Sequence, residues 1–296
     1  MKDFLTVRGM GRSDLETLIG EGDALRGDLD AGAIVERDLE GMCVANLFFE
    51  HSTRTRLSFD LAAQRLGAYV MTFDPERSST SKGESLRDTA LTVAGIGADI
   101  LVARHNEEGV PQLLAEWTGL PVVNAGDGAN EHPTQTVLDA LTLRRHFGTI
   151  EGLRMAIVGD IAHSRVAGGL IAAMPVLGAA VTLVAPQRWL PEESACPTSN
   201  DLDSVLGDID VVYLLRVQTE RGGVICDDYV ADFGFGASRL ASLQPEAVVM
   251  HPGPLNRGIE ISDEVADSPR SLIGEQVRNG VPMRMAVLRA LARGRV

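Results

Sequence analysis

The sequence predicts an α/β protein of two domains, each with a central parallel sheet flanked by helices, and three observations support this prediction. Short apolar runs alternate with longer segments of helical periodicity, which is the pattern of strand–helix units around a parallel sheet. The length of 296 residues suits two domains of about 150 residues each. Polar clusters also follow the carboxyl ends of the expected strands, where open α/β sheets bind their ligands.

The elements follow in chain order from the spacing of apolar residues. Strands are expected where the apolar runs are short, at 42–49, 100–103, 122–124, 155–158, 181–185, 211–215 and 248–250. Helices are expected where the apolar spacing is three to four residues, at 53–66, 85–95, 111–117, 134–146, 166–177 and 283–292.

The domain junction is expected at 148–153, because a helical segment precedes this stretch and a new apolar strand follows it. The first domain then covers 1–147 and the second covers 148–280. We expect the last helix, within 281–296, to pack back on the first domain.

Composition narrows the class of ligand. A net charge of −14 argues against nucleic acid as a partner, because phosphate backbones are bound by basic surfaces. No run of about 18 apolar residues could span a bilayer, and residues 1–14 lack the apolar segment of a signal peptide, so we expect a cytoplasmic protein with no membrane partner. Cys43, Cys196 and Cys226 lack metal-ligand or redox spacing and are expected to be free thiols.

Six polar clusters follow the strands, at 51–56, 104–105, 126–135, 159–165, 216–221 and 251–258. Because ligands bind beyond the carboxyl ends of parallel strands, we expect all six to face one cleft between two sheets. The first cluster is the most specific, since it places Ser and Thr hydroxyls, backbone N–H groups and two arginines at a helix N-terminus. That arrangement favours a phosphate, whereas an ordinary helix cap with exposed arginines is the structural alternative. The sequence has neither of the common glycine-rich nucleotide loops, which disfavours a nucleotide as the phosphate donor.

The cluster at 52–56 reads S-T-R-T-R, and with it the chain resembles the aspartate carbamoyltransferases nearly from end to end. Six further motifs in the same order carry the resemblance: S-K-G-E-S at 81–85, R-H at 104–105, H-P-T-Q at 132–135, G-D with H-S-R within 159–165, R-V-Q-T-E-R at 216–221, and H-P-G-P with N-R-G within 251–258. One departure is His51, where the family commonly has proline. The histidine is interpreted as a neutral substitution rather than a new catalytic group.

The resemblance implies which residues bind carbamoyl phosphate. Those implied to hold the phosphate are Ser52, Thr53, Arg54, Thr55 and Arg104. Thr55, Arg104 and His132 are implied to direct donors at the carbamoyl oxygen, and Gln135 and the Pro254 carbonyl to hold the amide nitrogen. Arg54, Thr55, Arg104 and His132 are therefore the expected catalytic residues. This fits the chemistry, because attack by an amine places negative charge on that oxygen.

The acceptor, L-aspartate, has two carboxylates and needs cations, and arginine suits carboxylates well. Arg165 and Arg216 follow neighbouring strands, and Gln218 shares a face with Arg216 by strand alternation. The resemblance implies that these three bind aspartate, although for either arginine taken alone a surface ion pair is the better interpretation. Glu220 and Arg221 resemble a loop that reorganises when the domains close.

Lysine occurs only at Lys2 and Lys82, and Lys82 lies in a polar, glycine-containing segment, 78–85. In the family this segment reaches the active site of an adjacent subunit, where Ser78 and Lys82 would contact both substrates. A homotrimer with shared active sites is the expected assembly. The resemblance leaves open whether regulatory or dihydroorotase chains bind. No metal and no cofactor are expected.

The implied reaction converts carbamoyl phosphate and L-aspartate to N-carbamoyl-L-aspartate and phosphate, a step of de novo pyrimidine biosynthesis. One alternative is a carbamoyltransferase with another acceptor, such as ornithine, but the chain lacks the H-C-L-P element expected for ornithine and has H-P-G-P at 251–254. The other alternative is a catalytically silent structural homologue. Such a protein should lose the phosphate loop or the lysine, and this chain has both.

Overall fold

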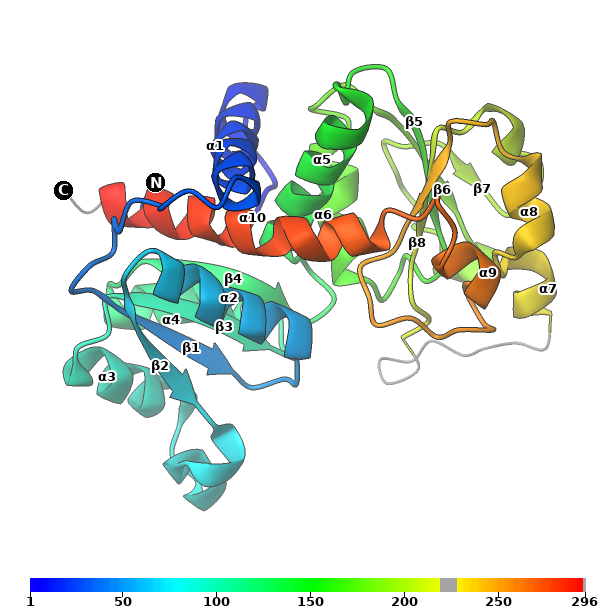
Figure 1. Ribbon diagram of the computed structural model, residues 1–296. Coiled ribbons are helices and arrows are strands. Elements are labelled where there is room, and N and C mark those ends of the chain that lie inside the picture. The colour runs from blue at the N-terminus through cyan, green and yellow to red at the C-terminus, as the bar shows by residue number, and fades with distance from the viewer. Residues whose placement is uncertain (219–227, 295–296) are drawn as a thin grey trace. The chain divides into compact units, whose positions relative to one another are not determined.

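A computed structural model describes residues 1–218 and 228–294, and the chain divides into two compact units (Figure 1). Unit 1 comprises 1–141 and 277–296, and unit 2 comprises 142–276. Two helices carry the chain across these bounds, α5 (Pro133–Phe147) and α10 (Ile273–Arg293). Unit 1 is thus assembled from both ends of the chain.

Unit 1 is built on a four-stranded parallel sheet with the strand order β2-β1-β3-β4. The strands are β1 (Cys43–Phe48), β2 (Tyr69–Phe73), β3 (Ile100–His105) and β4 (Val122–Asp127). Since all four run in the same direction, their carboxyl ends lie at one edge, and the β1–β3 register sets Phe48 beside Arg104.

Side-chain alternation along the strands divides the sheet of unit 1 into two covered faces. On one face, Ala45, Leu47 and Leu101 pack in a buried cluster with helices α3 (Leu86–Ile96) and α4 (Val110–Thr118). Asn46 points to the other face, where its Nδ2 donates to Oδ1 of Asp60 at 2.6 Å on α2 (Thr53–Arg65). Helix α2 therefore starts at the carboxyl edge of the sheet and runs back along it.

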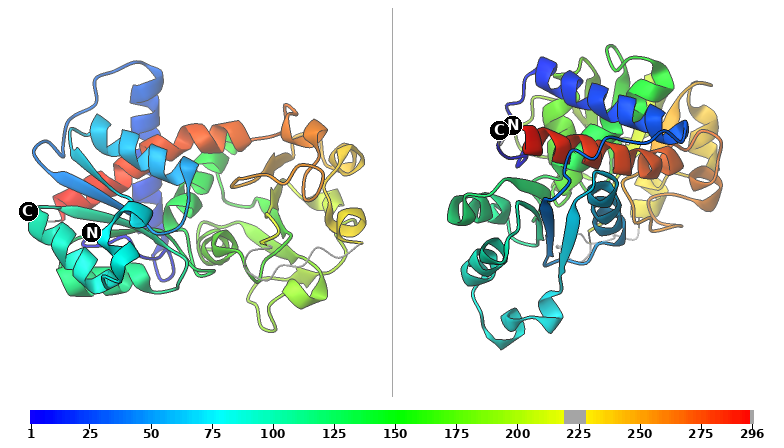
Figure 2. Two further views of the ribbon diagram at one scale, coloured as in Figure 1. Left: turned by 90° about the horizontal axis from the view of Figure 1, so that it is seen from below. Right: turned by 60° about the vertical axis from the view of Figure 1, so that its left-hand side comes forward.

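Helix α10 lies against α1 (Arg12–Asp30) and α2 (Figures 1 and 2). The contact with α1 depends on Gly22, because a Cβ atom there would lie 2.0 Å from the sulfur of Met283. On the α2 side, the guanidinium of Arg284 stacks on the ring of Phe59, with 5.1 Å between Cζ and the ring centroid. The C-terminal helix thus completes the interior of unit 1.

Between β2 and α3 the chain forms two short 3₁₀ helices, η1 (Pro75–Arg77) and η2 (Ser79–Lys82). This segment extends past the end of β2, away from the rest of unit 1 (Figure 1 and the right-hand view of Figure 2). Its hydroxyls bond internally: Ser78 Oγ and Thr80 Oγ1 both donate to the Pro75 carbonyl, at 2.9 and 2.8 Å. The segment is therefore an ordered projection rather than part of the core.

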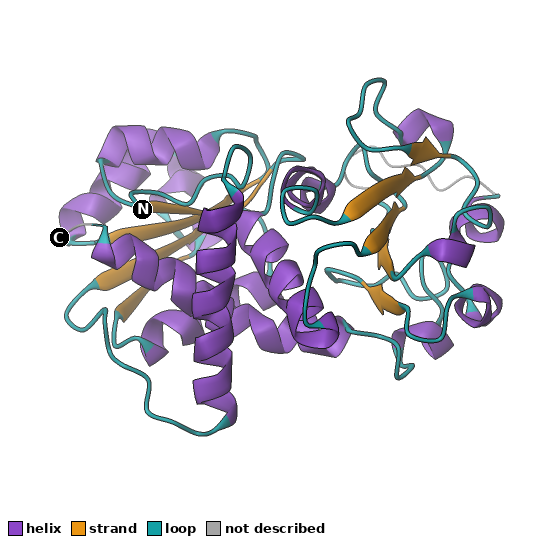
Figure 3. Cartoon of the chain, turned by 90° about the horizontal axis from the view of Figure 1, so that it is seen from above, coloured by secondary structure: helices purple, strands orange, loops and turns teal. Residues whose placement is uncertain are grey.

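Unit 2 has a five-stranded parallel sheet with the order β7-β6-β5-β8-β9 (Figure 3). Its strands are β5 (Arg154–Val158), β6 (Ala180–Val184), β7 (Thr198–Ser199), β8 (Val211–Leu214) and β9 (Val248–Met250). Its other helical elements are α6 (Arg165–Ala173), η3 (Gln187–Trp189), η4 (Leu206–Asp208), α7 (Tyr229–Phe233), α8 (Ala237–Ser242) and α9 (Asp263–Ala266).

The predicted fold class is confirmed, and each of the seven predicted strands is present with bounds shifted by at most a few residues. Two helical predictions were wrong in extent. The helix expected at 166–177 ends at Ala173, since Pro175 has no N–H to continue it. The helix expected at 283–292 begins at Ile273 and continues through Gly280 and Pro282, residues that normally weaken helices. Among the described residues, no helix is long and apolar enough to cross a membrane.

Candidate active site

The phosphate-loop residues lie at the N-terminus of α2, directly after β1. Ser52 is the N-cap, and its Oγ accepts a hydrogen bond from the Thr55 backbone N–H at 3.3 Å. Thr53 and Arg54 are exposed at the first turn, whereas Thr55 is buried. Hydroxyl side chains and an arginine therefore lie in the first turn, at the positive end of a 13-residue helix, which suits an anion.

Arg104 lies at the same edge of the sheet, near the end of β3. Its Nη2 donates to Oε1 of Glu50 at 2.8 Å and its Nη1 donates to the Ala125 carbonyl at 3.3 Å. With only 13% of the side chain exposed, the guanidinium is held in one orientation beside the start of α2. The structure thus brings together the two arginines expected to bind phosphate on one edge of unit 1.

His132 is buried directly before α5, and its Nε2 lies 3.4 Å from Oγ1 of Thr55. Burial holds the pKa of His132 well below its usual value, and the positive charges of Arg104 and Arg284 lower this pKa further. A neutral imidazole keeps one N–H donor and one acceptor nitrogen. His132 can therefore act as a hydrogen-bond donor but not as a cation at neutral pH.

Gln135 lies one turn into the same helix, and its Nε2 donates to Oδ1 of Asp139 at 3.0 Å. The loop before the helix is held by the buried carboxylate of Asp127, which accepts from Asn124 Nδ2 at 2.8 Å and from the Gly109 N–H at 3.0 Å. His132 and Gln135 are thus presented by a loop and a helix that buried hydrogen bonds keep in place.

Ser78 and Lys82 lie on the projecting segment. Lys82 is exposed, while Ser78 is half-buried and bonds within its own segment, with its Oγ 2.7 Å from Thr80 Oγ1. The segment approaches the phosphate loop through one exposed contact, in which His51 Nε2 lies 3.6 Å from Glu76 Oε1. Within the described part of unit 1, the hydrogen bonds of Ser78 stay inside its own segment, and neither Ser78 nor Lys82 bonds to Arg54, Arg104 or His132.

Unit 2 brings Arg216 and Gln218 together beyond the end of β8. Arg216 Nη2 donates to Gln218 Oε1 at 3.2 Å, and the Gln218 backbone N–H donates to Oδ2 of Asp160 at 3.0 Å. Asp160 is fully buried and also contacts Nδ1 of His163 at 2.7 Å. One carboxylate therefore organises the loops after β5 and β8.

Arg165 is the first residue of α6 and is 4% exposed. Ser164 caps the helix, with its Oγ accepting from the Ala167 N–H at 3.4 Å. A buried guanidinium needs compensating partners, so this position is not that of an ordinary surface ion pair. The alternative of an exposed Arg165 is thereby excluded.

Pro254 is exposed in the loop after β9, following a cis peptide bond with Gly253. His251 Nδ1 accepts from the Gly253 N–H at 2.9 Å, so its Nε2 carries the proton and faces Oε1 of Glu260 at 3.3 Å. The Asn256 N–H donates to the same oxygen at 2.5 Å. Glu260 and His251 are both buried and give this loop a defined shape.

Some expectations fall on residues outside the described part of the chain, namely Glu220, Arg221 and Cys226. Cys43 and Cys196 are free thiols. Among the described residues, no three His, Cys, Asp or Glu side chains are grouped so that they could hold a metal ion.

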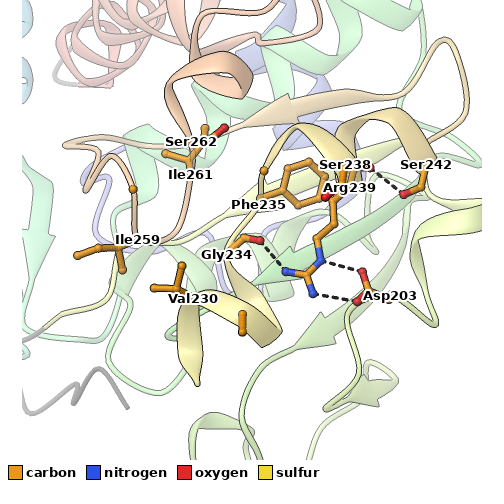
Figure 4. Close-up of a pocket in the computed structure, with 13 residues that line it drawn as sticks. Asp203, Val230, Gly234, Phe235, Ser238, Arg239, Ser242, Ile259, Ile261 and Ser262 are labelled. Carbon is orange, nitrogen blue, oxygen red and sulfur yellow. Dashed lines mark hydrogen bonds and ion pairs between the residues drawn. The ribbon is translucent and has the colours of Figure 1, made fainter. Parts of the chain in front are cut away.

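A cavity of about 490 Å³ lies elsewhere in unit 2, lined in part by Phe235, Arg239, Ile259 and Ser262 (Figure 4). Arg239 makes two bonds to Asp203, at 2.7 and 2.9 Å, and donates to the Gly234 carbonyl at 2.6 Å. Its charge is therefore already balanced, and the cavity contains none of the residues predicted from the motifs.

Models of two protein-family domains match the chain in the same order as the two site regions. The carbamoyl-P binding domain of aspartate/ornithine carbamoyltransferases matches residues 2–145, and the Asp/Orn binding domain matches residues 151–291. The chain belongs to the aspartate/ornithine carbamoyltransferase family. Together the two models account for nearly the whole carbamoyltransferase chain.

Individual relatives agree with this assignment. The aspartate carbamoyltransferase catalytic subunit of Acidothermus cellulolyticus is 50% identical over 298 residues, covering 94% of this carbamoyltransferase and 92% of the relative. That of Nocardioides is 48% identical and covers 99% and 95%.

Solved carbamoyltransferase structures agree as well. The aspartate transcarbamoylase of Trypanosoma cruzi, in complex with carbamoyl phosphate and aspartate, superposes with a TM-score of 0.89 at 32% identity, covering 98% of this chain and 96% of that one. The catalytic subunit of the M. Jannaschii aspartate transcarbamoylase has a TM-score of 0.88 at 34% identity and covers 99% of both chains.

Three buried charged residues that support the candidate site of this carbamoyltransferase were not predicted from the sequence. These residues are Asp139, Glu260 and Arg284. A signal was available for two of them, because Asp139 and Arg284 interrupt apolar helical segments, where an unpaired charge would be costly. Glu260 follows the last motif and accepts a hydrogen bond from its backbone. Asp160 belongs to the G-D motif, but its hydrogen bond with the Gln218 N–H was not predicted.

Proposed function

We propose that this chain transfers the carbamoyl group of carbamoyl phosphate to the amine of L-aspartate, giving N-carbamoyl-L-aspartate and phosphate. One observation carries the proposal: Arg104, Thr55 and a neutral His132 gather at the N-terminus of a helix that Ser52 caps. A phosphate fits the arginines and the helix end, and the neighbouring hydroxyl and imidazole suit a carbonyl oxygen.

The protein would act by positioning and electrostatics. The neutral α-amine of aspartate attacks the carbamoyl carbon, which forms the C–N bond and a tetrahedral intermediate. The C–O bond to phosphate then breaks, and the departing phosphate accepts the amine proton. Thr55, Arg104 and His132 donate to the oxygen on which negative charge develops, while Arg54 and Arg104 offset the charge of the phosphate.

The aspartate half of the site would be Arg216, Gln218 and Arg165. The hydrogen bond between Arg216 and Gln218 supports this assignment, because it leaves a planar fork and an amide side by side at the end of β8. Ornithine is the weaker candidate, since these groups suit a second carboxylate better than a second amine.

The proposed assembly is a homotrimer in which Ser78 and Lys82 complete the site of a neighbouring subunit. Two features of unit 1 support it. The projecting segment makes its contacts locally, and large apolar or aromatic side chains are exposed on α2 and on the edge strand β2: Leu57 is 60%, Leu61 41% and Tyr69 73% exposed. An exposed edge strand with apolar neighbours favours association.

The free thiols of Cys43 and Cys196 fit a reducing compartment, and we propose a cytoplasmic location.

An assay of the purified protein tests the function. Carbamoyl phosphate is supplied with aspartate, with ornithine or with buffer alone, and both phosphate and the carbamoylated amine are measured. Phosphate release that requires aspartate is expected, and release with ornithine but not aspartate would overturn the proposal. Light scattering of the same sample tests the trimer.

A further inference from the structure

Arg284 is a buried arginine behind the candidate carbamoyl site, with 4% of its surface exposed. Its guanidinium stacks on Phe59 and donates from Nη1 to the Gly280 carbonyl at 3.1 Å. This conformation needs glycine at 280, because a Cβ atom there would lie 2.7 Å from Nη1. The local structure of α10 therefore directs the charge of Arg284 into the interior of unit 1.

The counter-charge is Asp139, which is fully buried on α5. Burial lowers the pKa of Arg284 to about 10, and the attraction of Asp139 opposes this shift while the repulsion of Arg104 adds to it. Removing one member of a buried charge pair leaves the other uncompensated, so each residue needs the other. The attraction of Asp139 thus offsets part of the cost of burying the Arg284 charge beneath the site.

The buried side chain of Asp139 accepts a hydrogen bond that orients the amide of Gln135. A carboxylate only accepts hydrogen bonds, so the side chain of Gln135 must turn its NH₂ group toward Oδ1 of Asp139, at 3.0 Å. The amide oxygen of Gln135 then faces the opposite way. An oxygen there accepts a hydrogen bond from a substrate N–H, whereas a flipped amide would repel it.

We propose that Asp139 and Arg284 are positioning residues that make the site selective for a carbamoyl group, by holding the Gln135 oxygen as the acceptor for the carbamoyl NH₂. The inference rests on the proposed function and adds its substrate selectivity. Acetyl phosphate is the matched probe, because it replaces that NH₂ with a methyl group and keeps the carbonyl and the phosphate. Its transfer forms a C–N bond to aspartate, breaks the C–O bond to phosphate and yields N-acetyl-aspartate.

The experiment measures kcat/KM with carbamoyl phosphate and with acetyl phosphate. It compares three variants: Arg284→Met, the neutral pair that combines Asp139→Leu with Arg284→Met, and Arg278→Met. Arg278 is exposed on the same helix and serves as the matched control. We expect the ratio of carbamoyl to acetyl phosphate to fall about tenfold in the first two variants and to stay unchanged in the control. Where acetyl transfer is too slow to follow, the competitive Ki of acetyl phosphate against carbamoyl phosphate replaces its kcat/KM.

Melting temperature and light scattering show which variants fold and assemble, and the neutral pair is included because it leaves no uncompensated charge if Arg284→Met alone unfolds. A folded variant in which both activities fall by the same factor would overturn the inference, and so would an unchanged ratio. If the unsubstituted protein fails to carbamoylate aspartate, the proposed function itself fails, which is a separate result.

Discussion

The hydroxyl of Thr55 lies 3.4 Å from Nε2 of His132, and both side chains are buried. The contact joins the first turn of α2 to the residue before α5, which are 77 positions apart in the sequence. Two donors of different chemistry thus converge where the sheet of unit 1 ends. A neutral imidazole beside a hydroxyl stabilises a developing oxyanion without requiring a protonated acid.

Replacing Thr55 by valine keeps the shape of this side chain and removes its hydroxyl. We expect kcat to fall about a hundredfold, because one donor to the carbamoyl oxygen is lost. Thr55→Ser keeps the hydroxyl and should retain most of the activity. Steady-state kinetics of the two variants, with their melting temperatures, make the comparison, and equal activity of Thr55→Val and Thr55→Ser would remove Thr55 from the mechanism.

The stability of the folded chain should decrease as the pH falls below about 6.5. Burial, with Arg104 and Arg284, keeps the pKa of His132 well below 6.5, whereas in the unfolded chain it titrates near 6.5. The unfolded state therefore binds more protons between these two values, and the free energy of unfolding falls there by up to about 1.4 kcal/mol per pH unit.

Urea unfolding of the unsubstituted protein and of His132→Gln, at pH 7.5 and 5.5, measures this contribution. Burial also lowers the pKa of His105, so part of the pH trend remains in the variant. The loss of stability between the two pH values should be smaller in His132→Gln. A loss of the same size in both proteins would show that His132 is not the neutral buried group described above.

Arg54→Ala should abolish turnover while leaving the fold intact. The side chain is exposed, so its removal opens no cavity, but the phosphate loses a charge at the helix end. We expect kcat/KM for carbamoyl phosphate to fall at least about a hundredfold with an unchanged melting temperature. Arg65→Ala, at the other end of α2, is the matched control. Near-normal activity of Arg54→Ala would contradict the phosphate assignment.

Sharing of the site between subunits predicts recovery of activity in mixed assemblies. Lys82→Ala and Arg54→Ala chains should each be inactive alone, but a hybrid places an intact Lys82 beside an intact Arg54 at some of its sites. Mixing the two after dissociation should restore part of the activity, up to about a quarter after random mixing of equal amounts, because each mixed trimer has one intact site in three. A sample of the double variant treated in the same way gives the background. Verified subunit exchange without recovery would exclude a shared site.

Arg216→Lys should weaken aspartate binding selectively. Lysine keeps the positive charge but lacks the planar guanidinium, which donates a hydrogen bond to Gln218 and would bind a carboxylate. We expect KM for aspartate to rise tenfold to about a hundredfold while KM for carbamoyl phosphate changes little. Arg154→Lys, an exposed arginine of unit 2 paired with Asp210, is the control. An equal rise in both KM values would place Arg216 outside a separate aspartate subsite.

The strands were predictable because they are buried on both faces and read as continuous apolar runs. Strand β2 could not be predicted in this way, because it lies at the edge of the sheet, exposes Tyr69 and lacks a continuous apolar run. Helix α1 was not predicted, because three glycines interrupt its helical pattern. One of them, Gly22, packs closely against Met283, which is 261 positions away in the sequence. Such packing reasons cannot be seen along the sequence.

The candidate site likewise contains residues that motifs predict and residues whose role only the structure reveals. Short motifs mark Ser52, Thr55 and His132, because each of them lies at or directly before the start of a helix. The orientation of the Gln135 amide depends on Asp139 and then on Arg284, which is 145 positions further on. The groups expected to touch substrate could thus be predicted from the sequence, whereas the groups that hold them are visible only in the structure.

The two-part construction of unit 1 affects how the protein is made. Residues 277–296, which supply Met283 against Gly22 and the cation behind Gln135, are synthesised after the whole of unit 2. A nascent chain that ends at residue 141 can pair its four strands but still exposes the surfaces that α10 covers. Unit 2 is synthesised whole and can fold first, so completion of the carbamoyl-binding half should wait until residues 277–296 have been synthesised.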